Sequence, residues 1–169
     1  MSLKTQLTPL GGPVPTRLVP ALCTGNGYGT VSWSTQTNEQ YKGGATMSAT
    51  EFGCIHGGKI SNQNTVVFTL ATPVKSEDGN WIIDMRFTSM GNGYTRWFTL
   101  AATYTDGTGE QWISVNNVAY YNTATHHSFY TNKTVKTLTM VSYVINTRGE
   151  YYNAGQNVCV HYNKRVAGR

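Results

Sequence analysis

The sequence predicts an all-β protein: an antiparallel β-sandwich or jelly roll of about eight strands with an extended N-terminal arm. Only 12% of the 169 residues are charged, about half the roughly 25% of an average domain. The 25 Thr and 11 Tyr favour strands, while the 14 Asn and 18 Gly favour turns. Short runs alternate between apolar and polar residues, and no window has a convincing helical period. Because one-sided strands need a second sheet over their apolar face, a sandwich is favoured over a closed barrel.

Residues 1–22 are expected to form an extended arm. Four of the five prolines fall in residues 8–20, and proline removes backbone donors, which excludes a helix or a central strand there. The β-sandwich domain is expected to span 23–163, followed by a short basic C-terminal tail, 164–169. An arm of this composition has no core of its own, so either its own domain or a neighbouring subunit must hold it, and we favour docking on a neighbouring subunit. The expected subunit contacts are Pro9, Pro13, Pro15, Arg17 and Pro20.

The first strands are predicted from apolar residues that share one face. Val31 and Trp33 define a strand over 30–35. Two further strands follow, at 65–75 and 80–89. The side chains predicted to point inward are Val66, Phe68 and Leu70 in the first and Trp81, Ile83, Met85 and Phe87 in the second, with Asp84 and Arg86 outward.

The next two strands are bounded by turn signals. Residues 91–93 and 106–109 are rich in Gly and Asn or Asp, which favour tight turns. Strands are predicted at 94–104 and 110–115, with these side chains inward: Phe98, Leu100, Ala102, Ile113 and Val115. The four strands from residue 65 to residue 115 are expected to form an antiparallel meander.

The last two predicted strands, 134–146 and 156–163, differ in their pattern. The run from Val135 to Ile145 is apolar on both faces, which indicates a central strand or a bulge that changes the buried face. The strand 156–163 has one apolar face, formed by Val158, Val160 and Tyr162.

The charge distribution argues against a nucleic-acid partner. The net charge is +5, but five bases lie in the two ends of the chain, and the other eight balance all eight acids. A nucleic-acid arm usually has a denser basic block. No apolar run approaches the roughly 18 residues of a transmembrane helix, so membrane insertion is not expected.

The three cysteines allow at most one disulfide and leave one thiol over. The first residues contain no apolar signal-peptide core, so we expect synthesis in a cytoplasm. The pattern Cys-x-His occurs at Cys54 with His56 and at Cys159 with His161. Two such strands side by side could hold zinc. The usual zinc spacing is absent, so no metal site is predicted, and whether the two pairs meet stays open.

Aromatic and histidine side chains are the candidates for ligand binding. Trp97 and Trp112 fall on the polar faces of neighbouring strands. There they could form a platform for sugar rings, or be covered by the arm, the second sheet or another subunit. Residues 116–132 have the composition of a binding loop, which is also that of any long surface connection. The candidate contacts in it are Tyr120, Tyr121, His126 and His127.

The sequence contains no motif for a hydrolase. Neither Gly-x-Ser-x-Gly nor His-Glu-x-x-His occurs. A glycosidase needs two positioned carboxylates, and the eight acids show no such pair. We therefore expect a non-enzymatic protein without a cofactor.

These features predict a structural protein of a viral particle, with a bacteriophage as the first candidate. The roles considered are capsid decoration, a minor coat subunit, and a tail or spike component. Its partners would be copies of itself or other virion proteins, and its location the virion. The alternative is a glycan- or receptor-binding β-sandwich module that acts outside the cell, such as a lectin-like adhesin or tail tip.

Overall fold

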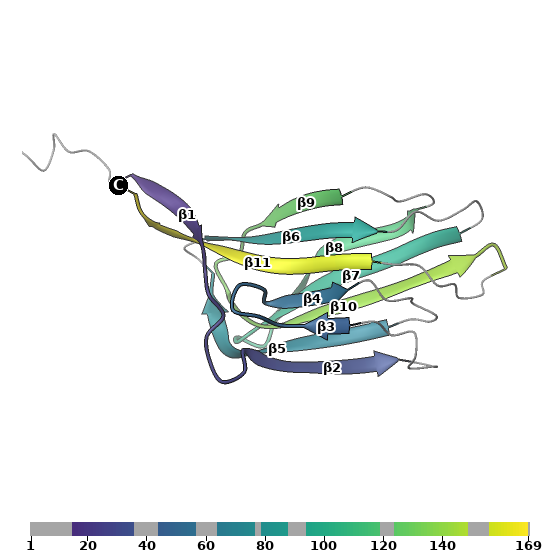
Figure 1. The fold of residues 1–169 in the computed structure, drawn as a ribbon, viewed down its shortest axis with the longest axis horizontal. Coiled ribbons are helices and arrows are strands. Elements are labelled where there is room, and N and C mark those ends of the chain that lie inside the picture. Colours follow the sequence, from purple (N-terminus) through teal and green to yellow (C-terminus); the bar gives the residue numbers. More distant parts are fainter. Residues whose placement is uncertain are drawn as a thin grey trace, which may run out of the picture.

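The computed structural model describes residues 15–35, 44–56, 64–76, 79–87, 94–118, 124–148 and 156–168. Within these ranges the regular elements are strands, packed as two antiparallel sheets (Figure 1). The predicted all-β sandwich is therefore confirmed. The described part of the chain has no helix long and apolar enough to cross a membrane.

The two sheets are built from strands distant in sequence. The six-stranded sheet has the order β3-β4-β11-β6-β9, with β1 beside β11. Its strands are β1 Thr16–Pro20, β3 Gly44–Thr46, β4 Gly53–His56, β6 Gly79–Phe87, β9 Ala124–Phe129 and β11 Gln156–Ala167. The five-stranded sheet has the order β2-β5-β10-β7-β8. Its strands are β2 Gly29–Thr35, β5 Asn64–Lys75, β7 Tyr94–Tyr104, β8 Gly109–Val118 and β10 Thr134–Asn146.

The core lies between the sheets and consists of side chains at alternate strand positions. Every inward side chain predicted in β6 is buried, while Asp84 and Arg86 are exposed. Those predicted in three other strands, β5, β7 and β11, are buried as well: Val66, Phe68, Leu70, Phe98, Leu100, Ala102, Val158, Val160 and Tyr162. Ile113 and Val115 pack against this core and are partly buried. Burial of a large apolar side chain stabilises the fold by about 1.5–3 kcal/mol, so this face decides how each strand is oriented.

Trp81 is the aromatic centre of the core. Its ring centroid lies 4.9 Å from that of Tyr162 and 5.3 Å from that of Phe52. The buried indole N–H donates to Ser76 Oγ at 2.9 Å, so its one polar group is satisfied. The side chain of Trp33, which was also expected in the core, lies outside the described residues.

The predicted four-stranded meander is wrong. β5, β7 and β8 belong to the five-stranded sheet, whereas β6 lies in the six-stranded sheet. The chain therefore changes sheet before and after β6. Alternation in a sequence fixes which face of a strand is buried, but it does not fix the neighbour beside which the strand lies.

β10 is a central strand that contains a bulge. It lies in the middle of its sheet, between β5 and β7. A register shift between Val135 and Thr137 marks the bulge in both pairings. The bulge puts Val135 and Leu138 on the buried face although they are three positions apart.

The described part of the N-terminal arm pairs with its own chain. β1 runs antiparallel to residues 163–167 of β11, and the two strands extend together away from the sheets as a ribbon (Figure 1). Residues 164–167, which were expected in a tail, are part of this β1–β11 ribbon. Three of the expected subunit contacts lie in or beside the ribbon: Pro15, Arg17 and Pro20. The other two, Pro9 and Pro13, lie outside the described residues.

Candidate functional site

The outer face of the six-stranded sheet carries a row of polar side chains. Antiparallel pairing places His126 of β9 opposite Asp84 of β6, and Asp84 opposite Cys159 of β11. Cys159 in turn lies opposite Cys54 of β4. Opposed residues on neighbouring strands point to the same side of the sheet, with Cβ atoms roughly 4.5–5.5 Å apart. Strand register therefore gathers side chains that are far apart in the sequence.

Asp84 is the centre of this row because two histidines face its carboxylate. His126 Nδ1 lies 2.5 Å from Asp84 Oδ1, and His161 Nε2 lies 3.5 Å from Asp84 Oδ2. The exposed side-chain fractions are 65% for His126, 52% for Asp84 and 30% for His161. A ligand can thus reach all three from solvent. Ion pairs as exposed as these contribute only about 0–1 kcal/mol to stability, so the fold does not depend on them.

The hydrogen-bond partners decide which nitrogen of each imidazole carries a proton. The carbonyl oxygen of Thr50 accepts from His161 Nδ1 at 3.2 Å, and the carboxylate of Asp84 accepts from His126 Nδ1. His161 Nε2 is left facing Asp84 Oδ2, as an acceptor in the neutral imidazole and as a donor in the doubly protonated one.

Two adjoining hollows lie over these side chains. One has a volume of about 370 Å³ and the other of about 440 Å³, and both are lined by Asp84, His126 and His161. The other polar residues that line them are Thr50, Arg86, Thr125, Asn157, Cys159 and Asn163. We call the joined hollows the Asp84 groove. Their volumes fall in the range of small-molecule sites, a few hundred Å³.

Arg86 balances the charge of the groove. It is exposed and lies two residues after Asp84 on β6, so the two side chains point to the same face. The formal charges of the Asp84 carboxylate and the Arg86 guanidinium cancel each other. Such a groove favours a neutral polar ligand over a polyanion or a small cation.

Trp112 does not lie on an outer face, contrary to the prediction. The pairing of β8 shifts between Leu100 and Ala101 of β7, and Trp112 is the extra residue of this bulge. Its ring turns inward, is 8% exposed and stacks on Phe129 at a centroid distance of 4.7 Å. Its indole N–H donates to the hydroxyl of Tyr104 at 3.0 Å. The predicted platform of two tryptophans therefore does not form.

Trp97 is partly exposed on the outer face of the five-stranded sheet. It alternates with the buried Arg96 and Phe98 and lies opposite Tyr143 of β10. The Asp84 groove is on the outer face of the other sheet. Trp97 and Asp84 therefore cannot contact the same small ligand.

The stretch 116–132 includes an edge strand, β9, where a binding loop was expected. An edge strand exposes parts of both faces and needs no clear alternation, so the pattern gave no signal. His126 lines the Asp84 groove, whereas His127 is opposite the buried Ile83, on the other face of the strand. Outside the described residues lie Tyr120 and Tyr121.

The two Cys-x-His patterns meet because β4 and β11 are neighbours. Cys54 and Cys159 form a disulfide, and Cys23 is the free, buried thiol. The expectation of at most one disulfide with one thiol over is confirmed. His161 faces Asp84, whereas His56 Nε2 lies 2.7 Å from Thr46 Oγ1.

The sequence analysis named His126 as a candidate ligand contact, considered His161 only as a possible zinc ligand, and did not name Asp84 as a site residue. Asp84 and His161 both stand on polar positions of predicted strands, which does not indicate that they meet. Their meeting depends on β11 lying between β4 and β6, an order that the sequence does not reveal. The fold and this site define a β-sandwich protein with a polar groove on one outer face.

No protein-family model matches the sequence, and no curated protein matches it. Solved structures with a similar arrangement of strands include CpGH89CBM32-4, produced by Clostridium perfringens, in complex with GlcNAc-α-1,4-galactose. Its identity is 9% and its TM-score 0.47, over 89% of this chain and 95% of that one. Chitosan-binding module 1 from a Paenibacillus chitosanase/glucanase has 11% sequence identity and a TM-score of 0.42, over 85% of this chain and 99% of that one. Truncated AlyQ, with CBM32 and alginate lyase domains, has 10% sequence identity and a TM-score of 0.44, over 90% of this chain and 35% of that one.

Proposed function

We propose that this chain is a non-enzymatic module that binds a glycan in the Asp84 groove. The observation that carries the proposal is the cluster of Asp84, His126 and His161, whose accessible polar atoms line both hollows of the Asp84 groove. His126 orients the carboxylate of Asp84, and the carbonyl of Thr50 orients the imidazole of His161. These side chains offer hydrogen-bond donors and acceptors to the hydroxyl groups of a ligand.

A sugar meets these demands better than an anion or a metal ion does. Neighbouring hydroxyls of a sugar ring can donate to Asp84 and His161 while their oxygens accept from Arg86. An anion would face the carboxylate, and a metal ion would face the guanidinium. The contacts stand on paired strands, so little ordering is needed on binding.

The composition of the groove supports binding without bond cleavage. Asp84 is the one carboxylate among the described residues that line it. Most glycoside hydrolases place two carboxyl groups on either side of the scissile bond. A single carboxylate paired to an imidazole can bind a sugar, but it is only one of the two carboxyl groups that this cleavage needs.

The Cys54–Cys159 disulfide supports a location outside a reducing cytoplasm. Disulfides persist in secreted proteins and at cell or virion surfaces, and they are rare in reducing compartments. An extracellular location therefore accompanies the glycan-binding proposal.

A glycan array with the labelled full chain, followed by calorimetry with the strongest-binding oligosaccharide, tests the proposal. Asp84→Asn keeps the shape of the side chain and removes its charge. We expect binding to weaken roughly tenfold or more, since a hydrogen bond to a charged group contributes about 1.5–3 kcal/mol. The free energy of unfolding should hardly change, because the pairs of Asp84 are exposed.

Trp97→Ala and a chelator provide the controls. Neither should change the affinity, because Trp97 lies on the other sheet and the proposed contacts need no metal. Loss of binding in Trp97→Ala with full binding in Asp84→Asn would move the site to the five-stranded sheet. Loss with the chelator, or an array without any bound glycan, would also refute the proposal.

A second candidate is the structural subunit of a virion, and the β1–β11 ribbon favours it. The ribbon extends from the body (Figure 1), and none of the other described strands pairs with β1. Leu18 is 39% exposed and Leu22 is 63% exposed, next to the basic Arg17, Lys164 and Arg165. An open strand edge with exposed leucines is suited to pair with another chain.

Light scattering after size-exclusion chromatography tests this second candidate. The wild-type chain should form an oligomer, and Leu18→Asp with Leu22→Asp should dissociate it. The far-ultraviolet circular dichroism of the double variant should stay unchanged, because both side chains lie outside the core. A wild-type chain that elutes as a monomer at every concentration would rule the ribbon out as a self-association surface.

A further inference from the structure

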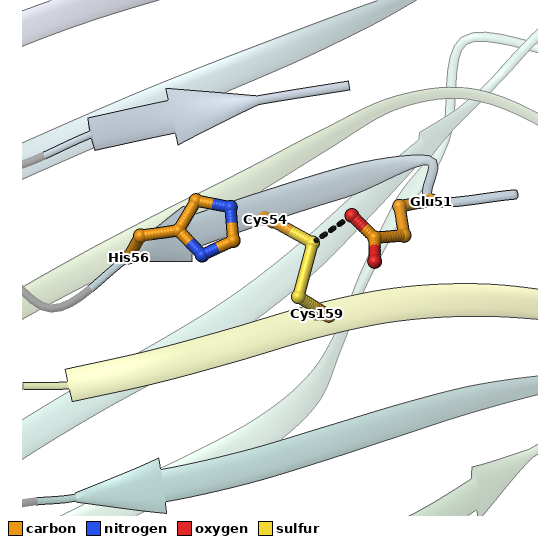
Figure 2. Close-up of side chains that lie close together, drawn as sticks. All are labelled: Glu51, Cys54, His56 and Cys159. Carbon is orange, nitrogen blue, oxygen red and sulfur yellow. Dashed lines mark hydrogen bonds between the residues drawn. A yellow bond between two sulfur atoms is a disulfide. The ribbon is translucent and has the colours of Figure 1, made fainter. Parts of the chain in front are cut away.

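The disulfide between β4 and β11 is bordered by two further metal-ligand side chains. Cys54 and Cys159 are directly opposite each other, with Cα atoms 4.2 Å apart. Figure 2 shows His56 on one side of the two sulfurs and Glu51 on the other. Glu51 Oε2 lies 3.1 Å from Cys54 Sγ.

These four residues hold their ligand atoms close together. One atom from each of Glu51, Cys54, His56 and Cys159 lies within 4.8 Å of all the others. Among the described residues, this is the one group of His, Cys, Asp and Glu that meets this distance. A tetrahedral zinc ion with bonds of about 2.0–2.3 Å sets its ligands roughly 3.3–3.8 Å apart. To form the site, the two sulfurs would move apart once their bond is reduced, and the outer ligand atoms would move inward by on the order of 1 Å.

The side chains around the disulfide are already held in place. Thr46 Oγ1 lies 2.7 Å from His56 Nε2, and such a contact on one ring nitrogen orients the imidazole. The backbone N–H of Glu51 donates to Ser48 Oγ at 3.1 Å, which fixes the turn before β4. Cys54 is fully buried, so its sulfur is screened from solvent.

We propose that reduction of the Cys54–Cys159 disulfide converts this cluster into a Zn²⁺ site with Cys54, Cys159, His56 and Glu51 as ligands. The proposal does not rest on ligand binding in the Asp84 groove, although Cys159 also lines that groove. Zinc would hold β4 to β11 in a reducing compartment, and the disulfide would hold the same two strands in an oxidising one. β4 and β11 are then cross-linked in both compartments, by zinc in one and by the disulfide in the other.

The chemistry is thiol–disulfide exchange followed by metal binding. An external dithiol breaks the S–S bond, and its own two thiols are oxidised to a disulfide. Cys54 and Cys159 together gain two electrons and two protons. When Zn²⁺ binds, both thiols lose their protons to solvent, because thiolates are the ligands. Two thiolates and an imidazole favour Zn²⁺ over Mg²⁺ or Ca²⁺, which prefer oxygen ligands.

Cobalt(II) absorption of the full chain tests this site. The chain is reduced with a dithiol, which is removed anaerobically, and Co²⁺ is added as a coloured substitute for zinc. We expect thiolate-to-cobalt charge-transfer bands and tetrahedral d–d bands at one equivalent, and their loss when Zn²⁺ is added. The oxidised chain should show neither set of bands. A reduced chain that gives no bands at stoichiometric Co²⁺ would overturn the proposal.

Variants separate this site from other metal binding. His56→Ala and Glu51→Gln should each weaken Co²⁺ binding roughly tenfold or more. Cys23→Ser and His127→Ala should keep the wild-type bands, because neither residue is in the cluster. Bands that survive in both His56→Ala and Glu51→Gln at unchanged affinity, or that vanish in Cys23→Ser, would contradict the ligand set.

Thermal unfolding supplies a readout that does not depend on colour. Zn²⁺ should raise the melting temperature of the reduced chain and leave that of the oxidised chain unchanged, since a ligand stabilises the state that binds it. Equal melting temperatures of the reduced chain with and without Zn²⁺ would refute the site.

Discussion

Cys23 shows how surroundings set the chemistry of a single residue. Burial, and secondarily the carboxylate of Glu51, raise the pKa of its thiol to about 11. The thiolate is the reactive form in alkylation and in disulfide exchange. Cys23 is therefore a poor nucleophile near neutral pH, and it leaves the disulfide of Cys54 and Cys159 intact.

Alkylation of the native, oxidised chain checks this state of Cys23. At pH 8 only about one thiol in a thousand is ionised when its pKa is near 11, so iodoacetamide should react far more slowly than with the chain in guanidinium. Mass spectrometry at timed intervals measures both rates. Equal rates in the folded and unfolded chain would show that the thiol is neither buried nor suppressed.

The turn between β7 and β8 is an element held together by one carboxylate. Asp106 Oδ1 accepts from the backbone N–H of Thr108 at 2.8 Å and from its hydroxyl at 2.6 Å. Lys133 Nζ lies 3.2 Å from Asp106 Oδ2. The Thr108 hydroxyl above all, then its backbone N–H and Lys133, lower the pKa of Asp106 from 3.8 to about 2.

This turn should make stability depend on acid. A depressed pKa means that the folded state prefers the ionised carboxylate, so the contribution of Asp106 is complete above pH 3.8 and disappears toward pH 2. Asp106→Asn should lower the melting temperature at pH 7, and the difference from wild type should shrink between pH 4 and pH 2. Thr108→Val, which removes the same hydroxyl contact, should behave alike. A difference that stays constant down to pH 2 would contradict the role of the charge.

Prediction from sequence works for strands with one apolar face and fails where packing departs from simple alternation. In β6 and β11 the buried side chains were predicted correctly one by one, because large apolar residues such as Trp81 and Val160 occupy only one face of each strand. The inward turn of Trp112 needs a bulge, and β9 lies at an edge, so neither has a period-2 signal. The Asp84 groove depends on strand order, which the local sequence does not encode.

At the scale of the whole molecule, the disulfide ties two distant parts of the chain. Cys54 and Cys159 are 105 residues apart, and closing a loop of that length removes entropy from the unfolded chain worth up to about 5 kcal/mol. The double variant Cys54→Ala with Cys159→Ala should lose stability of that order in urea unfolding. A midpoint and slope equal to those of the oxidised wild type would show that the bond adds nothing to stability.

The inner and outer faces of the sheets carry different kinds of side chain. Their inner faces form the core, while the outer face of the six-stranded sheet carries Asp84, His126 and His161, whose exposed pairs add little to stability. Side chains that add little to stability and stand on a rigid sheet are available to bind a ligand. We propose that this face, rather than the face of Trp97, binds the glycan.

An amide chemical-shift map of the ¹⁵N-labelled, oxidised chain tests that claim most directly. The titrant is the oligosaccharide that binds best on the array. We expect the largest shifts to cluster on β6, β9 and β11, around Asp84, His126 and His161, and Asp84→Asn to reduce them. Shifts that cluster around Trp97 on the five-stranded sheet, or along the β1–β11 ribbon, would contradict it.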